Sequence, residues 1–559
     1  MQVFRGVLGI LLCTLLFHVI QVASISQVTF VSDVHYDPFY GQKNAFSHCT
    51  SAANAALGEP GCDSPKALMD SMASDISLQK SDFTLYAGDW QRHKFDAKLV
   101  ADVLFVDMNK SFSSILTLNL PPVKSFSGAW GNNDVVPDYY FDVTKKDHVH
   151  LKERIKILNG SLYSKEEADT MVQCAFFSRR LEEVSFVNLH SLIWSTTLKP
   201  PLADNVDDPC GQFAFLEKEL EFARKKSKKV VIIAHIPPIL DTYIVIRNGK
   251  FSNASHDMLW NESFYKRYIN LMSAFQDVVS AQLFGHLHLF YLLCFPGIGS
   301  PAFVLPSISP IYGNVPSYLL STFSNSWDLI DLNQRSLIDS GWRDTVNVKG
   351  ALGLVDGFGN LNSTREQIKG LYKNEVMWLN HLKLHNGGQA TDQVFYHMNT
   401  SSFSRAVIVC SMLSGIYDDI KKCVDELVAS KEPVINDYPK LITFLTIFLP
   451  IIGVIIVACL IALIVCIVVR GRKIKNFKEL DSHTLTVHVP SGEMQQEGES
   501  CKNPNKELKV QRDTNTNQGQ RDEKVASLKK NSDKQRLDGH TVQVLVVEPS
   551  NQIAKDARE

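Results

Sequence analysis

Five short clusters of Asp, His and Asn residues each follow an apolar run, and together they offer ligands for metal ions. The clusters are Asp33-Val34-His35, Gly88-Asp89, Gly131-Asn132, His235-Ile236-Pro237 and Gly285-His286-Leu287-His288. Oxygen and imidazole ligands without thiolates suit zinc, manganese or iron better than an iron–sulfur cluster or a structural Cys site. One carboxylate, for which Asp89 is the best candidate, can bridge two ions about 3.5–4 Å apart. The clusters therefore predict a site for a pair of metal ions.

The apolar runs before the five clusters must position them. Runs of four to eight apolar residues, many of them β-branched or aromatic, are typical of buried strands. The runs cover residues 27–32, 83–87, 123–130, 230–234 and 279–284. Ligands bind at the carboxyl ends of the strands in open α/β sheets. One such cluster usually forms only a turn, but five in this order favour a single site built from several loops.

The order of the clusters, D-x-H, G-D, G-N, H and G-H-x-H, resembles the calcineurin-like metallophosphoesterases over roughly residues 27–320. The resemblance implies an α/β fold with a four-layer αββα sandwich. It also implies an enzyme that hydrolyses phosphoric esters or anhydrides with two divalent ions, zinc being expected and manganese or iron being alternatives. The implied ligands are Asp33, His35, Asp89 and His288 for one ion and Asp89, Asn132, His235 and His286 for the other.

Two branches of that family are similar to different parts of the sequence. The stretch D-V-H-Y-D-P-F-Y from Asp33 resembles acid sphingomyelinase-like phosphodiesterases, as do the early pair of Cys residues and a Cys-containing helical region near the C-terminus. The stretches G-D-W-Q-R-H from Gly88 and G-N-N-D-V-V-P from Gly131 are more similar to endopolyphosphatases. The branches are themselves related, so both resemblances can hold.

Asn133 stands where most of the family has a His that can protonate the leaving group. His93, four residues after Asp89, is then the best remaining donor, and it joins Asn132 as a predicted catalytic residue. An anhydride needs less acid help, because phosphate is a far weaker base than an alkoxide. We therefore expect polyphosphate as the favoured substrate, or a nucleotide-type anhydride, with Arg92 and Asn133 as substrate contacts. Arg92 could equally be a solvated surface charge.

Two other functions fit the same sequence. An acid sphingomyelinase-like phosphodiesterase would act on sphingomyelin or nucleotides. A non-catalytic phosphate or lipid receptor could keep the fold, although a decayed enzyme normally loses ligands and none of the seven is missing here. The expected partners are a phosphate-containing substrate (polyphosphate, a nucleotide or a phospholipid headgroup) and a membrane.

Two apolar segments near the ends predict the topology. Residues 1–24 carry Arg5 before an apolar run and end in small residues, which is typical of a signal peptide, with an uncleaved anchor as the alternative. Residues 441–469 contain no charge, are long enough to cross a bilayer, and precede a basic cluster from Arg470. The sequence therefore predicts a single-pass protein whose larger part lies in the lumen or outside the cell. Its membrane could be endolysosomal, vacuolar or the cell surface.

The segments between and after these two complete the expected organisation. We expect a catalytic domain at 25–345, a small helical subdomain and stalk at 346–438, and a disordered cytoplasmic tail with unknown partners at 470–559. Six glycosylation sequons all lie between the two apolar segments, as a lumenal domain requires. They are Asn109, Asn159, Asn253, Asn261, Asn362 and Asn399.

Seven Cys residues fall in the same lumenal part, where disulfides form. Pairing neighbours in the sequence gives Cys49–Cys62, Cys174–Cys210 and Cys410–Cys423, and leaves Cys294 as a buried thiol. Composition excludes two further classes. With 45% hydrophobic and 10% aromatic residues the chain is not disordered as a whole, and a net charge of −2 argues against a nucleic-acid binder.

Overall fold

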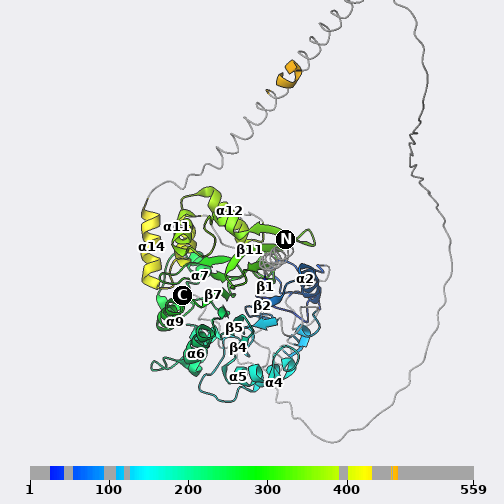
Figure 1. The fold of residues 1–559 in the computed structure, drawn as a ribbon, viewed down its shortest axis with the longest axis vertical. Helices are drawn as coiled ribbons and strands as arrows, with labels where there is room; N and C mark the ends of the chain where they lie inside the picture. The colour runs from blue at the N-terminus through cyan, green and yellow to red at the C-terminus, as the bar shows by residue number, and fades with distance from the viewer. Residues whose placement is uncertain are drawn as a thin grey trace, which may run out of the picture. The chain divides into compact units, whose positions relative to one another are not determined.

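The computed structural model describes residues 26–42, 49, 55–93, 109–111, 113–118, 126–388, 401–430, 455 and 458–463. All statements below concern these residues. They form a mixed α/β fold built on two six-stranded sheets (Figure 1). The predicted signal segment, most of 441–469, Asn399 and the tail lie outside the described residues.

The first sheet contains the first three predicted strands at one side. Its order is β12-β11-β10-β1-β2-β3, in which β1, β2 and β3 run parallel and β10 pairs antiparallel with β1. The strands are β1 Ser26–Val31, β2 Phe83–Tyr86, β3 Phe126–Gly128, β10 Ser317–Phe323, β11 Leu329–Ile338 and β12 Gly341–Asn347. The apolar runs at 27–32 and 83–87 are thus confirmed as strands, and so is the described end of the run at 123–130.

The second sheet contains the other two predicted strands, side by side. Its order is β4-β5-β6-β7-β9-β8, with β5, β6, β7 and β9 parallel. The strands are β4 Phe177–Arg180, β5 Val184–Asn188, β6 Lys229–Ile233, β7 Val279–Phe284, β8 Tyr291–Leu293 and β9 Ala302–Val304. The sequence did not reveal that the five strands would divide between two sheets, because periodicity indicates burial and not the pairing partner.

The two sheets meet through a shared aromatic and polar interface. The rings of Phe83 in β2 and Phe186 in β5 lie 5.2 Å apart, and Trp327 packs against both. Nearer the predicted ligands, Asn188 at the end of β5 donates from Nδ2 to Ser127 Oγ in β3 at 2.8 Å. All of these residues except the part-buried Phe83 are buried, so the core between the sheets fixes the loops at their edge.

Helices cover the sheets and lie mainly in two groups (Figure 1). Helices α4, α5 and α6 lie near β4 and β5, whereas α11, α12 and α14 lie together at the opposite end. The helices before residue 275 are α2 Lys66–Gln79, α4 Val149–Leu158, α5 Lys165–Cys174, α6 Gln212–Lys225, α7 Thr242–Asn248, α8 Ala254–Asp257 and α9 Glu262–Ala274, with short 3-10 turns η3 Ser191–Trp194 and η4 Pro209–Gly211.

The region after β12 is helical where the structure describes it, as the sequence predicts. The helices are α10 Val348–Leu352, α11 Leu361–Gly370, α12 Glu375–His385, α13 Ser402–Ser411 and α14 Tyr417–Ala429. Helix α12 begins anew because the Asn374 side chain caps it by accepting from Met377 N. Between α13 and α14, Gly415 packs so closely on Tyr265 that a Cβ there would overlap the ring. Turns therefore separate α11 from α12 and α13 from α14.

Two histidines of α12 give this region an expected response to pH. His381 and His385 are fully buried, their ring centroids lie 4.1 Å apart, and no ring nitrogen makes a hydrogen bond of normal geometry with a described residue. Burial lowers the pKa of His385 to about 3 and that of His381 well below its usual range, and Arg405 lowers the latter further.

In the unfolded chain these histidines titrate at about pH 6.5. Below about pH 6.5 the unfolded chain therefore binds protons at these two residues that the folded chain does not bind. The free energy of unfolding should fall as pH decreases from about 6.5 towards 3, by up to about 1.4 kcal/mol per pH unit for each histidine. Urea unfolding of wild type and His385→Phe at several pH values checks this. The variant should show the shallower slope, and identical slopes would contradict the expectation.

The cysteine pairing predicted from the sequence is confirmed. Disulfides join Cys49 to Cys62, Cys174 to Cys210 and Cys410 to Cys423, and Cys294 is a buried free thiol. Three disulfides are consistent with an oxidising compartment of the secretory route.

The described part of the chain contains no helix that is both long and apolar enough to cross a bilayer. From the predicted segment 441–469 only residues 455 and 458–463 are described, and they are helical.

Candidate metal centre

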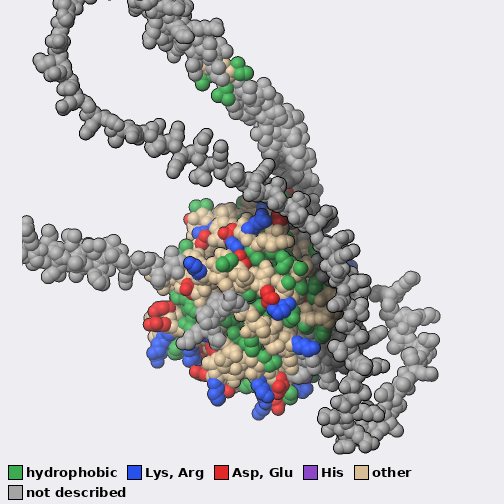
Figure 2. Space-filling view, turned by 90° about the vertical axis from the view of Figure 1, so that its right-hand side faces the viewer, with side chains coloured by type: hydrophobic (Ala, Val, Ile, Leu, Met, Phe, Trp, Pro, Cys, Tyr) green, Lys and Arg blue, Asp and Glu red, His purple; other side chains and the backbone are tan. Residues whose placement is uncertain are grey.

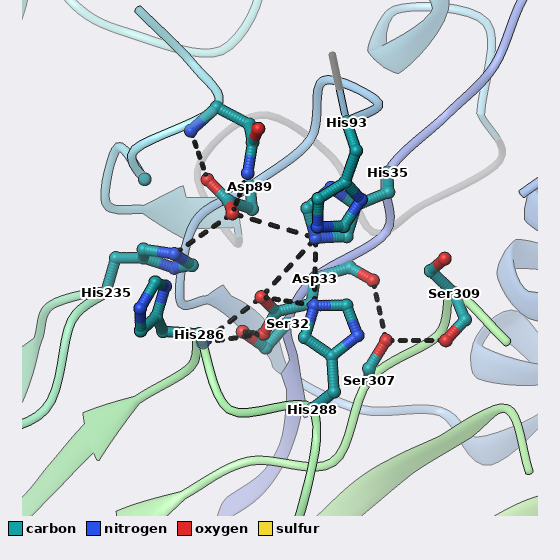
Figure 3. Close-up of polar contacts among 12 residues, drawn as sticks. Ser32, Asp33, His35, Asp89, His93, His235, His286, His288, Ser307 and Ser309 are labelled. Atoms are coloured by element: carbon teal, nitrogen blue, oxygen red, sulfur yellow. Dashed lines mark hydrogen bonds and ion pairs between the residues drawn. The ribbon is translucent and has the colours of Figure 1, made fainter. Parts of the chain in front are cut away.

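All seven predicted ligands lie together where strands of the two sheets end. Figure 3 labels six of them, all except Asn132. Asp33 and His35 follow β1, Asp89 follows β2 and Asn132 follows β3, while His235 follows β6 and His286 and His288 follow β7. Five of them have a left-handed backbone conformation, which residues other than Gly rarely adopt. They are Asp33, His35, Asp89, His286 and His288, with φ of 50°, 44°, 61°, 75° and 60°. Such strain costs about 1–3 kcal/mol each and gathers at functional sites.

One group of ligands surrounds Asp33. His288 Nε2 lies 3.4 Å and His35 Nε2 3.6 Å from Asp33 Oδ1, and His35 Nε2 is also 3.6 Å from Asp89 Oδ2. His35 Nε2 and His288 Nε2 are 3.1 Å apart, with His35 Nδ1 bonded to the Gln91 carbonyl at 2.9 Å. Ser32 Oγ donates to Asp33 Oδ2 at 2.5 Å. The donors thus converge on one small volume and are oriented by hydrogen bonds behind them.

A second group shares Asp89. His235 Nε2 lies 3.1 Å from Asp89 Oδ2 and 3.0 Å from Asn132 Oδ1. The His235 ring is fixed from behind, because its Nδ1 bonds to the Ala87 carbonyl at 2.8 Å. His286 completes the group, with its ring 5.2 Å from that of His235. Asp89 therefore belongs to both groups, as the sequence-based prediction of a bridging carboxylate requires.

His93 lies at the edge of this site. Its ring stacks on His35 at 3.9 Å, and it can share an ion with His35 and His288. Asp63 holds His93 twice, by accepting from its backbone N at 2.9 Å and by bonding Nδ1 at 3.0 Å. Its Nε2 lies 3.5 Å from the Tyr312 hydroxyl. The structure thus brings the predicted proton donor to the site but also makes it available as a further ligand.

The two predicted substrate contacts lie at the site in different settings. Asn133 donates from its backbone N to Asp89 Oδ1 at 2.8 Å and from Nδ2 to Asp89 Oδ2 at 2.7 Å. It therefore orients the shared carboxylate. Arg92 is buried, with Nε 3.7 Å from Asp37 Oδ1, so it is not the solvated surface charge that was one expectation. Its charge is already balanced in part by this carboxylate.

Asp134 is a central residue to which sequence reasoning gave no role. Its carboxylate accepts from the backbone N of Asp89, Trp90, Gln91 and Gly131 at 2.8–3.0 Å. It thereby joins the loop after β2 to the loop after β3. Burial and the nearby Asp89 charge raise the pKa of Asp134. Its place in G-N-N-D was the available signal, whereas Asp63 carried no motif that could have indicated its role.

The charges of the site depend on one another. Burial opposes ionisation of Asp33, but His288 and the neighbouring histidines outweigh it and lower the pKa of Asp33 to about 2. His235 and His35 likewise hold the pKa of Asp89 below its usual range despite burial. Burial lowers the pKa of His286 to about 4 and that of His288 further below the ordinary value. The same carboxylates act in the opposite direction on two other rings, because Asp33 and Asp89 outweigh burial and raise the pKa of His35 and of His235 to about 9. These two imidazoles must therefore release their protons when they bind divalent cations.

The residues fit a pair of divalent ions. Buried Asp, Asn and His donors without thiolates, in two groups that share one carboxylate, match the ligand types of zinc, manganese and iron. Two glycines let the loops approach the ligands. A Cβ on Gly131 would overlap the Asp89 carboxylate, and one on Gly285 would overlap Ser32 Oγ and crowd Asp33.

Gly131→Ala should therefore displace Asp89 and lower hydrolytic activity by about 100-fold, an effect comparable to the loss of a key electrostatic contact. Gly359→Ala is the matched control, since a Cβ there meets nothing within 4 Å. Steady-state kinetics with a chromogenic phosphodiester, alongside circular dichroism melting, checks this. Equal activity of the two variants would contradict the close packing at Gly131.

Comparison with known proteins agrees with the resemblance found in the sequence. No family model matches the chain. It is 25% identical over 290 residues to sphingomyelinase phosphodiesterase D of Dictyostelium discoideum, which covers 50% of this chain and 61% of the relative. It is 26% identical over 303 residues to human acid sphingomyelinase-like phosphodiesterase 3b, covering 51% and 63%. It is 25% identical over 290 residues to the endopolyphosphatase of Schizosaccharomyces pombe, covering 46% of each.

The chain is therefore a homologue of acid sphingomyelinase-like phosphodiesterases and endopolyphosphatases. The matched part spans about three fifths of the length of the two phosphodiesterases and less than half of the endopolyphosphatase. Among solved structures, GAP50, the anchor in the inner membrane complex of Plasmodium, matches with a TM-score of 0.32 and 8% identity, covering 61% of this chain and 94% of that one. The phosphoesterase YfcE of Escherichia coli matches with 0.20 and 12%, covering 55% and 97%.

Proposed function

We propose that this protein is a dinuclear-metal phosphoesterase that hydrolyses phosphoanhydride or phosphodiester bonds. The observation that carries the proposal is the double group of donors that shares Asp89. In this proposal Asp33, His35, Asp89 and His288 hold one ion, and Asp89, Asn132, His235 and His286 hold the other. Zinc is the proposed metal, and the fold is an αββα sandwich of the metallophosphoesterase type.

The chemistry that two such ions supply is neutralisation of the phosphoryl oxygens and activation of water near neutral pH. The protein contributes orientation. Ser32, Asn133 and Ala87 hold Asp33, Asp89 and His235 by hydrogen bonds, so the donors need little rearrangement when a substrate binds. Asp63 fixes the imidazole of His93 so that Nε2 is directed away from it, and this nitrogen can hold a proton for the leaving group.

The small number of proton donors at the site favours an anhydride as substrate, because its leaving group needs little protonation. Asn133 has no proton to give and is engaged with Asp89, which leaves His93 as the only donor among the predicted catalytic residues. Polyphosphate and nucleotide anhydrides expel phosphate and need the least acid help. The pairing of Arg92 with Asp37 and the mixture of charges on the face in Figure 2 give no particular support to a long polyanion. Phosphodiester hydrolysis is the second candidate, which the names of the relatives favour.

A substrate panel tests the proposal on the full-length protein in detergent. The panel contains long-chain polyphosphate, a nucleoside triphosphate, sphingomyelin and a nitrophenyl phosphodiester, each with zinc or manganese, at pH 5 and 7. Metal-dependent turnover of any substrate supports the phosphoesterase, and turnover of none would favour the non-catalytic receptor. His93→Ala should slow hydrolysis of sphingomyelin, whose alkoxide is the poorer leaving group, more than hydrolysis of the anhydride. Equal losses on both would contradict the donor role.

The topology belongs to the same proposal. We propose a signal peptide at 1–24, a lumenal or extracellular catalytic domain at 25–345, the helical subdomain and stalk at 346–438, a membrane anchor at 441–469 and a cytoplasmic tail at 470–559. Of the sequons, Asn159, Asn253 and Asn362 are exposed and can accept a glycan. Asn109 and Asn261 are half-buried, and Asn261 donates to the backbone of Trp194, which makes them poorer acceptors.

A further inference from the structure

Tyr139 lies at the edge of the metal centre and has no part in the chemistry proposed above. Its ring centroid is 6.3 Å from that of His286, and the two rings meet edge to face at 81°. The backbone N of Tyr139 donates to the Asn132 carbonyl at 3.1 Å, and its carbonyl accepts from Lys199 N at 2.8 Å. The residue is thus fixed between the loop after β3 and a second loop, with its ring beside one of the predicted ligands.

The backbone of Tyr139 is strained. Tyr140 N donates to the Pro137 carbonyl at 3.0 Å and closes a four-residue turn, in which Tyr139 takes the third position with a φ of 61°. A turn with positive φ at this position favours Gly or Asn, and a bulky side chain there is rare. Residues held in such conformations gather at functional sites. The turn alone therefore gives no reason for a Tyr at this position.

The hydroxyl of Tyr139 makes no hydrogen bond with a described residue, although the residue is half-buried. Tyr hydroxyls usually have a partner when they are covered by protein. Burial, the charge of Asp89 and the hydroxyl of Tyr312 raise the pKa of Tyr139 well above its usual range, so the hydroxyl keeps its proton. A protonated donor without a protein acceptor thus lies within the field of the shared carboxylate.

The surroundings of this hydroxyl suit a negatively charged acceptor. The exposed ammonium group of Lys199 lies 5.8 Å from the centroid of the Tyr139 ring and makes no ion pair with a described carboxylate. Hydrogen bonds to ionised oxygens are about twice as strong as those between neutral groups. The oxygens of a phosphoryl group are acceptors of this kind, and they gain charge during the reaction.

We propose that Tyr139 is a further catalytic residue, whose hydroxyl donates to an oxygen of the phosphoryl group under attack. The inference rests on the proposed phosphoesterase function and adds a contact that polyphosphate, nucleotides and phosphodiesters share, because each of them carries this phosphoryl group. The role differs from that proposed for His93, which acts on the leaving group and therefore depends on the substrate.

The test removes this hydroxyl alone. Tyr139→Phe keeps the ring beside His286, and Tyr140→Phe is the matched control, because Tyr140 is 37% exposed and its hydroxyl contacts the Lys145 ammonium at 3.5 Å. The assay uses the full-length protein with zinc or manganese. Tyr139→Phe should lower kcat by about 100-fold on ATP, the nitrophenyl diester and sphingomyelin alike, with KM nearly unchanged. Tyr140→Phe should behave as wild type.

Unchanged kcat in Tyr139→Phe, or a loss that appears only in KM, would overturn the inference and leave the phosphoesterase function in place. A loss confined to sphingomyelin would also overturn it, because the hydroxyl would then act on the leaving group. If wild type hydrolyses none of the substrates, the phosphoesterase function fails, and calorimetric titration of the zinc-loaded protein with inorganic phosphate decides the inference. Phosphate binding that weakens about tenfold in Tyr139→Phe supports the contact. Equal binding by the two proteins, or no binding, overturns it.

Discussion

Asp89→Asn should reduce hydrolysis by at least about 1,000-fold and leave the fold intact. Asp89 belongs to both groups of donors, and its two oxygens accept from Asn133 as well. An amide keeps the shape but removes the negative charge that two cations would share, so both ions should bind more weakly. Steady-state kinetics with a nitrophenyl phosphodiester or ATP measures the loss.

Two measurements separate this effect from misfolding. Asp277→Asn is the matched control, because Asp277 is exposed and pairs only at the surface with Arg224. It should keep full activity, and both variants should melt within a few degrees of wild type. If Asp89→Asn retains a tenth or more of the activity, the shared carboxylate is not part of the reaction.

The largest expected loss of stability comes from Arg179→Met. Arg179 in β4 is buried and donates to Glu167 at 2.7 and 2.9 Å and to the Leu162 carbonyl at 2.6 Å. It also donates to the Phe126 carbonyl at the start of β3, and so connects the two sheets. Its removal leaves Glu167 as a buried unpaired charge, which costs about 3–5 kcal/mol.

Urea unfolding followed by tryptophan fluorescence measures this loss. Arg224→Met removes the exposed pair with Asp277 and should change the free energy of unfolding by no more than about 1 kcal/mol. Similar values for the two variants would mean that Arg179 does not hold the sheets together as its contacts indicate.

The strands and the candidate ligands at their ends were predictable because they depend on local sequence. An apolar run that ends in D-x-H or G-H-x-H indicates both a buried strand and the side chains at its end, and Asp33, His35, His286 and His288 lie where this pattern places them. The three disulfides were predicted by pairing cysteines that are neighbours in the sequence, and the structure contains these pairs.

What the sequence left open depends on contacts between distant segments. Asp134 and Asp63 act through residues 30 or more positions away, such as Trp90 and His93, and no spacing rule reports such contacts. The pairing of β1–β3 in one sheet and β6–β7 in the other is likewise set by tertiary packing. Tyr139 meets the ring of His286 only because the loop after β3 packs against the loop after β7.

The central claim is that two metal ions at this centre carry the reaction, and metal removal tests it most directly. The full-length protein is dialysed against a chelator, assayed on ATP and the nitrophenyl diester, and then titrated with zinc or manganese while bound metal is counted by emission spectrometry. We expect loss of activity on removal, and recovery that is complete at two ions per chain in wild type but absent in Asp89→Asn. Activity that survives complete metal removal, or full activity at a single bound ion, would contradict the two-metal centre.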